Sequence, residues 1–242
     1  MDITPQADSH THSRRAALYT LLIAAIVTVV IWQFPWGNYV LYPFTILATW
    51  FHEMGHGLSA QLLGGNFERL TLYADGSGVA RYTTTVDFSG FKKGIIAAAG
   101  PLGPAIAGAI FIIAGRNYRS GQICLWLLLL ILVLSAFLWI RSGFGLSATL
   151  LLAGSLFLIL WLTPHWMQQF TIQFLGVQAI ISAWRQLDYL FTYSVTIADQ
   201  APMLSDTGQM AKYLFLPYWF WASFLIVIGL ALLFGSLRIA YR

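Results

Sequence analysis

Residues 50–65 read W-F-H-E-M-G-H-G-L-S-A-Q-L-L-G-G and place two histidines and a glutamate inside an apolar segment. The apolar segment begins near residue 39 and ends near residue 63, which is long enough to cross the hydrocarbon core of a bilayer. Ionisable groups are costly at that depth, and a shared function is the simplest reason for their presence. The pattern therefore predicts a membrane helix that carries a polar site.

The composition of the whole chain supports a membrane protein. The chain has 242 residues, of which 58% are hydrophobic and 9% are charged, whereas a soluble domain carries about a quarter charged residues. The formal charge of +4 comes from Lys and Arg residues scattered between apolar runs rather than clustered on one face, so we expect no nucleic-acid partner. The predicted fold class is an all-α polytopic membrane protein with six or seven transmembrane helices.

The apolar runs define the predicted organisation. Residues 1–13 form a polar tail that we expect to be disordered, and residues 14–242 form a single integral-membrane domain. Between the second and third spans, residues 66–86 change to β-branched and aromatic residues around the turn A-D-G-S-G, which predicts a small β-hairpin. The spans are expected near residues 16–34, 39–63, 94–114, 122–140, 144–162, 171–190 and 214–237.

Two of these spans have special features. The third contains A-A-A-G-P-L-G-P, whose small residues allow close helix packing, and Pro101 and Pro104 are expected to kink or interrupt it. The sixth is interrupted by polar residues, including Gln173, Gln178 and Asp188, so it should face protein or a wet cavity. The distribution of Lys and Arg favours a multi-pass protein with a cytoplasmic N-terminus.

The H-E-M-G-H sequence predicts a metal site. In a helix, His52 and His56 project from one face a turn apart, which is the spacing that two imidazoles need to bind one Zn²⁺ ion. Glu53 is then placed to act as a general base towards a water that zinc activates. The simpler alternative is that these three groups only satisfy one another within a helical bundle.

A catalytic zinc needs a third protein ligand from elsewhere in the chain. Asp188 is the leading candidate, because it lies at the end of a polar helix. With seven spans, this end is predicted to lie on the same side of the membrane as the end of the H-E-M-G-H helix. Asp206, in L-S-D-T, is the runner-up, and His165 and Asp199 are further candidates. Each aspartate also has a simpler explanation that involves no metal: Asp188 could form an ion pair with Arg185, and Asp206 could cap the helix that follows it.

These motifs together resemble the site-2 protease family of intramembrane zinc metallopeptidases, in particular its short branch that lacks a PDZ domain. The resemblance covers residues 51 to about 221 and rests on F-H-E-M-G-H-G, D-G-S-G-V, A-G-P-L-G-P, R-Q-L-D-Y and S-D-T, in that order. It implies that His52, His56 and an aspartate bind zinc while Glu53 serves as general base. This chain has L-D-Y where better-studied members have L-D-G or N-P-D-G.

The expected function is therefore zinc-dependent hydrolysis of peptide bonds in transmembrane protein substrates. The edge of the hairpin, at Leu70, Leu72 and Val79, would bind an extended substrate by strand addition, unless the hairpin only caps the bundle. The alternative function is a non-proteolytic membrane scaffold or binding protein with the same fold. A divalent-metal transporter would show more polar residues along its spans, and a prenyl-protein type protease would need a second suitable glutamate, for which Glu68 lies too near the motif.

Overall fold

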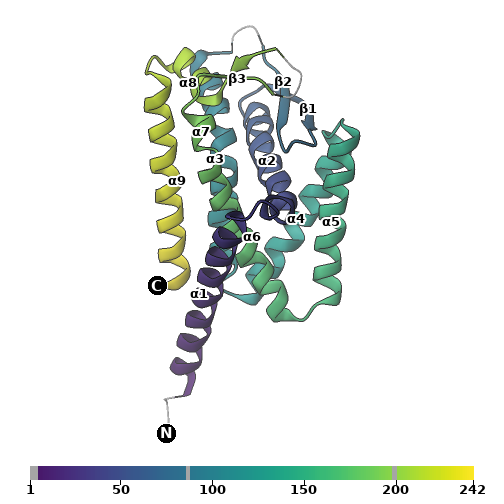
Figure 1. Cartoon of the computed structure of the whole chain (residues 1–242), viewed down its shortest axis with the longest axis vertical. Helices are drawn as coiled ribbons and strands as arrows, with labels where there is room; N and C mark the ends of the chain where they lie inside the picture. The colour runs from purple at the N-terminus through teal and green to yellow at the C-terminus, as the bar shows by residue number, and fades with distance from the viewer. Residues whose placement is uncertain (1–4, 86–87, 198–200) are drawn as a thin grey trace.

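The computed structural model describes residues 5–85, 88–197 and 201–242. Helices dominate the fold and pack as a bundle, with the strands gathered at one end beside α7 and α8 (Figure 1). Helix α1 begins at Pro5, within residues 1–13, which were predicted to form a polar tail. The elements are α1 (Pro5–Trp32), α2 (Gly37–Leu62), β1 (Asn66–Leu72), β2 (Gly78–Thr83), α3 (Gly90–Ala114), α4 (Tyr118–Leu138), α5 (Gly143–Leu162), α6 (His165–Arg185), α7 (Leu187–Leu190), β3 (Ser194–Val195), β4 (Met203–Leu204), α8 (Asp206–Leu214) and α9 (Tyr218–Tyr241).

Within the described residues, four helices are long and apolar enough to cross a membrane by length and composition: α3, α4, α5 and α9. Large apolar side chains on α4, α5 and α9 are exposed, as expected for surfaces that face lipid rather than water. Helices α2 and α6, which carry the polar motif residues and the glutamines, are not among the four. The protein is therefore an integral membrane protein, and the total of six or seven spans stays a prediction.

Helix α3 lies at the centre of the bundle, against α2, α6, α8 and α9. Small residues allow the close contact with α2: a methyl group added at Gly55 would lie 2.2 Å from the carbonyl oxygen of Ala99, and one added at Gly103 would lie 2.4 Å from that of Phe51. The predicted close packing is thus present. The predicted interruption is absent, because α3 continues as one helix through Pro101 and Pro104.

The predicted β-hairpin is confirmed as an antiparallel pair of β1 and β2. Its turn is stabilised by Asp75, whose Oδ1 accepts hydrogen bonds from the Ser77 amide at 2.8 Å and hydroxyl at 2.6 Å. These bonds favour the carboxylate and lower the pKa of Asp75. Gly76 supplies the positive φ of +90° that the turn requires.

Polar side chains inside the bundle find protein partners. On α6, Gln173 donates to the Gly115 carbonyl at 3.1 Å and Gln178 donates to the Thr28 hydroxyl at 2.6 Å, as expected for a helix that faces protein. Between α2 and α4, the indole of the buried Trp50 donates to the Ser135 hydroxyl at 2.9 Å. These bonds satisfy groups that would otherwise be costly to bury, and they fix how α2 and α6 are placed in the bundle.

Candidate metal centre

The two histidines of the motif lie one turn apart on α2 and face the same point. Their Nε2 atoms are 3.2 Å apart, and both side chains are largely buried. Helical geometry alone brings them together, because positions i and i+4 share a face. The predicted pairing of His52 and His56 is therefore present.

The carboxylate that joins them comes from Asp206, the first residue of α8. Its Oδ2 lies 3.0 Å from Nε2 of His52, and its Oδ1 lies 3.2 Å from Nε2 of His56. The helix cap is Ser205, whose hydroxyl accepts from the Gly208 amide at 3.1 Å. Since Ser205 performs the capping, the Asp206 side chain is free to face the histidines.

The surroundings of these three side chains fit a divalent cation. His52 donates through Nδ1 to Oε1 of Gln186 at 3.1 Å, and His56 donates through Nδ1 to the Ile96 carbonyl at 2.7 Å. With protons on both Nδ1 atoms, both Nε2 lone pairs point at the carboxylate. Oδ2 of Asp206 is buried without a hydrogen bond. A cation would satisfy this oxygen and both nitrogens, and two imidazoles with one carboxylate are a common catalytic zinc donor set.

The electrostatics of Asp206 agree with a positive charge at this point. Burial raises the pKa of its carboxyl, but the positive charge of the His56 and His52 imidazoles, when these are protonated, outweighs burial and holds the pKa below its usual range. The carboxylate form is therefore the one that the site stabilises.

Glu53 lies in the same cleft and is held by the hairpin. Its Oε2 accepts a hydrogen bond from the Ala80 amide at 2.6 Å, and the side chain is buried. The absence of a side chain at Gly78 makes room for it, because a methyl group there would lie 2.9 Å from Cγ of Glu53. The cleft runs between α2, β2 and the segment around β4, and its lining includes His52, Glu53, His56, Val79, Ala80, Tyr189, Met203 and Asp206.

The structure corrects the expected position of Asp188. This residue is exposed on α7, where its backbone carbonyl accepts from the Thr192 hydroxyl at 2.7 Å, and it does not belong to the group of candidate ligands. The physical reason is the break between α6 and α7: the chain turns after Arg185, and Tyr189 rather than Asp188 then faces His52. The runner-up, Asp206, occupies the position expected for Asp188.

The other candidate ligands lie elsewhere. His165 begins α6, is exposed and stacks on Tyr118 with ring centroids 4.1 Å apart. Asp199 lies outside the described residues. Neither one therefore adds a ligand to the group that the structure describes.

Only part of the predicted hairpin edge is open to a substrate. The Leu70 amide donates to the Trp139 carbonyl at 2.8 Å and the Leu72 amide donates to the Ser142 hydroxyl at 3.2 Å, while both side chains are buried. The segment that joins α4 to α5 thus occupies the outer edge of β1. A substrate strand therefore cannot pair with this edge at Leu70 and Leu72, contrary to the expectation from the sequence. Val79, on β2, lines the cleft.

Comparison with protein-family models identifies the family of this chain. A family model described as Peptidase M50B-like matches residues 20–236, almost the whole chain. The chain belongs to this family. The match confirms the resemblance to the site-2 proteases, and it makes this M50B-like protein a member of a family of zinc metallopeptidases of membranes. No curated protein and no solved structure matches the chain.

Three contacts of the M50B-like site were missed by the sequence analysis: the Gln186 amide on His52, the Ala80 amide on Glu53, and the Tyr189 hydroxyl, which accepts from the Asp206 amide at 3.3 Å. Gln186 and Tyr189 lie on either side of Asp188 in R-Q-L-D-Y. The prediction therefore pointed to the right segment, but to Asp188 rather than to the two residues that contact the site. The Ala80 contact involves a backbone amide and leaves no trace in the residue type.

Proposed function

We propose that this M50B-like protein is an intramembrane zinc endopeptidase that hydrolyses peptide bonds in transmembrane protein substrates. One observation carries the proposal: His52, His56 and Asp206 converge on a single point in a cleft that also contains Glu53. A scaffold would not need a buried carboxylate beside three metal-ligand groups, because each such group is costly to bury.

His52, His56 and Asp206 would hold the zinc ion. When bound, zinc acts as a Lewis acid that lowers the pKa of a water molecule to about 7 and polarises a scissile carbonyl. The Nδ1–H bonds to Gln186 and Ile96 keep both imidazoles oriented for this task.

Glu53 is the proposed general base. The Ala80 amide holds one of its carboxylate oxygens at 2.6 Å, which leaves the other oxygen to take a proton from the attacking water. The same carboxyl then returns the proton to the leaving amine, so that one residue serves both steps of the hydrolysis.

The cleft favours an extended substrate. A helix shields its peptide carbonyls, so a transmembrane segment must unwind locally before its backbone reaches Glu53. We expect the unwound segment to lie along β2 at Val79 and Ala80, with Met203 of β4 on the other side of the cleft.

The test compares wild type with Glu53→Gln, purified in detergent with zinc. Each protein is incubated with a panel of single-span transmembrane peptides, new peptide ends are identified by mass spectrometry, and bound zinc is measured by elemental analysis. Glu53→Gln should lose cleavage by a factor of at least about 100, as expected for a general base, and should keep its zinc. Glu68→Gln, at an exposed position on β1, is the matched control and should cleave like wild type.

Two results would contradict the proposal. Wild-type cleavage by Glu53→Gln would remove the general-base role. Zinc-loaded wild type that cleaves no member of the panel, under conditions where the peptides reach the protein, would favour the scaffold function.

A further inference from the structure

The segment R-Q-L-D-Y contacts the candidate metal centre through residues on either side of Asp188. Oε1 of Gln186 accepts from Nδ1 of His52 at 3.1 Å. The Tyr189 ring packs edge-on to the His52 ring, and the Tyr189 hydroxyl accepts from the Asp206 amide at 3.3 Å. This short segment therefore touches two of the three candidate ligands, although its own aspartate is exposed.

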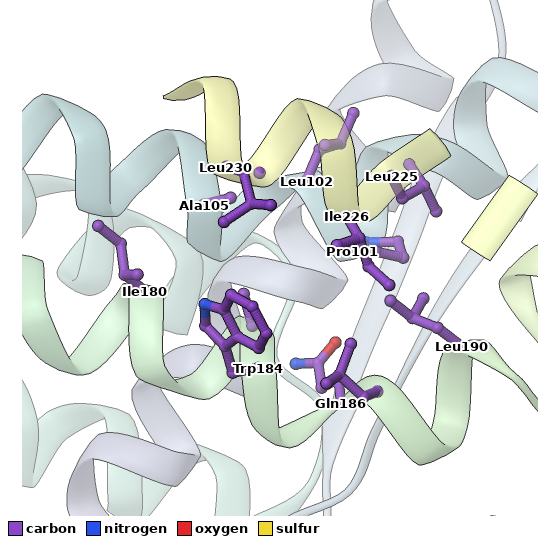
Figure 2. Close-up of a pocket in the computed structure, with 13 residues that line it drawn as sticks. Pro101, Leu102, Ala105, Ile180, Trp184, Gln186, Leu190, Leu225, Ile226 and Leu230 are labelled. Carbon is purple, nitrogen blue, oxygen red and sulfur yellow. The ribbon is translucent and has the colours of Figure 1, made fainter. Parts of the chain in front are cut away.

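The backbone of Gln186 is held at the junction between α6 and α7. Its amide donates to the Trp184 carbonyl, and its carbonyl accepts from the Leu190 amide at 2.9 Å. Figure 2 shows the side chain between Trp184 and Leu190, below Pro101 of α3, in the pocket that α3, α6, α7 and α9 enclose. The helix break therefore places the amide, and His52 does not have to recruit it from a mobile loop.

The hydrogen bond decides which nitrogen of His52 is available. An imidazole that donates through Nδ1 carries its lone pair on Nε2, and Nε2 is the atom that faces Asp206 at 3.0 Å. His56 has the equivalent bond to the Ile96 carbonyl. Both histidines are thus oriented by a hydrogen bond from Nδ1. The acceptor is the Gln186 side chain for His52 and the Ile96 backbone carbonyl for His56.

An amide suits this position for an electrostatic reason. It presents a carbonyl oxygen to the Nδ1–H group without adding a third carboxylate next to Glu53 and Asp206, and a further buried negative charge would be costly. Backbone carbonyls and carboxylates are the more usual partners of metal-binding histidines.

We propose that Gln186 is a positioning residue for the metal ligand His52: its Oε1 fixes the orientation in which Nε2 of His52 faces His56 and Asp206. This inference rests on the proposed function, because it assigns the role towards a zinc ion held by those three side chains. Gln186 is not one of the three candidate ligands and acts through His52.

The experiment measures zinc binding by the full-length protein in detergent, in competition with a chromogenic chelator, for variants of Gln186. Gln186→Leu has a similar volume but no acceptor, and Gln186→Asn keeps the amide but withdraws it by one methylene. Both should bind zinc about 10–100-fold more weakly, the usual effect of removing such a partner. Gln186→Glu keeps the acceptor oxygen and should bind within a few-fold of wild type. The control is Gln173→Leu on α6, which removes a buried amide bonded to Gly115 instead and should leave affinity unchanged.

The visible spectrum of the cobalt-loaded proteins provides a second readout, because its bands report the ligand geometry. We expect an altered spectrum in Gln186→Leu and Gln186→Asn and a wild-type spectrum in Gln173→Leu. If Gln186→Leu does not fold, Gln186→Asn decides. Wild-type affinity and spectrum in the variants without the acceptor would overturn the positioning role alone. Absence of zinc binding by wild type would overturn the proposed function and this inference with it.

Discussion

Gly100 on α3 lies directly against the candidate metal centre, and its replacement by alanine tests the geometry of His56. A methyl group at this position would lie 2.1 Å from Nε2 and 2.3 Å from Cε1 of the His56 ring, whereas ordinary contact begins at 3.4 Å. The shortfall is about 1 Å, and separating α2 from α3 to relieve it would cost the close packing of Gly55 on the Ala99 backbone. The imidazole must therefore leave its position.

A displacement of about 1 Å at a catalytic group costs about 100-fold in rate. Gly100→Ala should therefore reduce cleavage by about 100-fold and weaken zinc binding by at least about 10-fold, since the His56 ring also loses its bond to Ile96. Overpacking should in addition lower the free energy of unfolding by about 1–3 kcal/mol. The assays are chelator competition, peptide cleavage and thermal unfolding in the same detergent.

Gly154→Ala on α5 is the matched control, because a methyl group there meets no atom within 4 Å. It should bind zinc and cleave like wild type, with a helix slightly favoured by the change. Wild-type zinc affinity and cleavage in Gly100→Ala would refute the reasoning, since His56 would then not lie against Gly100.

Two further predictions concern the third ligand and the packing of α2. Asp206→Asn should weaken zinc binding by more than about 100-fold, since loss of a ligand costs more than loss of its hydrogen-bonding partner. Asp188→Asn should bind zinc like wild type in the same chelator competition. Weaker binding by Asp188→Asn than by Asp206→Asn would restore Asp188 as the candidate ligand. Ser135→Ala leaves the buried Trp50 indole without its acceptor and should lower the free energy of unfolding by about 1–3 kcal/mol, measured by thermal unfolding in detergent; an unchanged midpoint would mean that the indole contributes nothing through this bond.

The local features of the site were predictable from the sequence, because they depend on spacing along one helix. The i, i+4 relation of His52 and His56 and the adjacent Glu53 follow from helical periodicity. The hairpin follows equally locally from β-branched residues around a turn that contains Gly76. The small residues near Gly100 predicted the close contact of α3, but not that this contact is with the His56 ring.

Only the tertiary structure decided which aspartate joins the histidines. Asp188 and Asp206 are both plausible in the sequence, and the choice depends on a helix break after Arg185 and on a cap at Ser205. Both features are set by how α6, α7 and α8 pack on α3, and small changes of chain direction there reverse which side chain faces inward.

The same reason explains the edge of β1, which the connection between α4 and α5 covers. Short-range rules describe a residue's own turn of helix or strand, whereas a metal centre built from distant segments depends on the path of the chain between them. The sequence by itself thus determined the class of protein, the histidine pair and the hairpin. The packing of the bundle decided which aspartate joins the histidine pair, the partner of His52 and the face of the hairpin that borders the cleft.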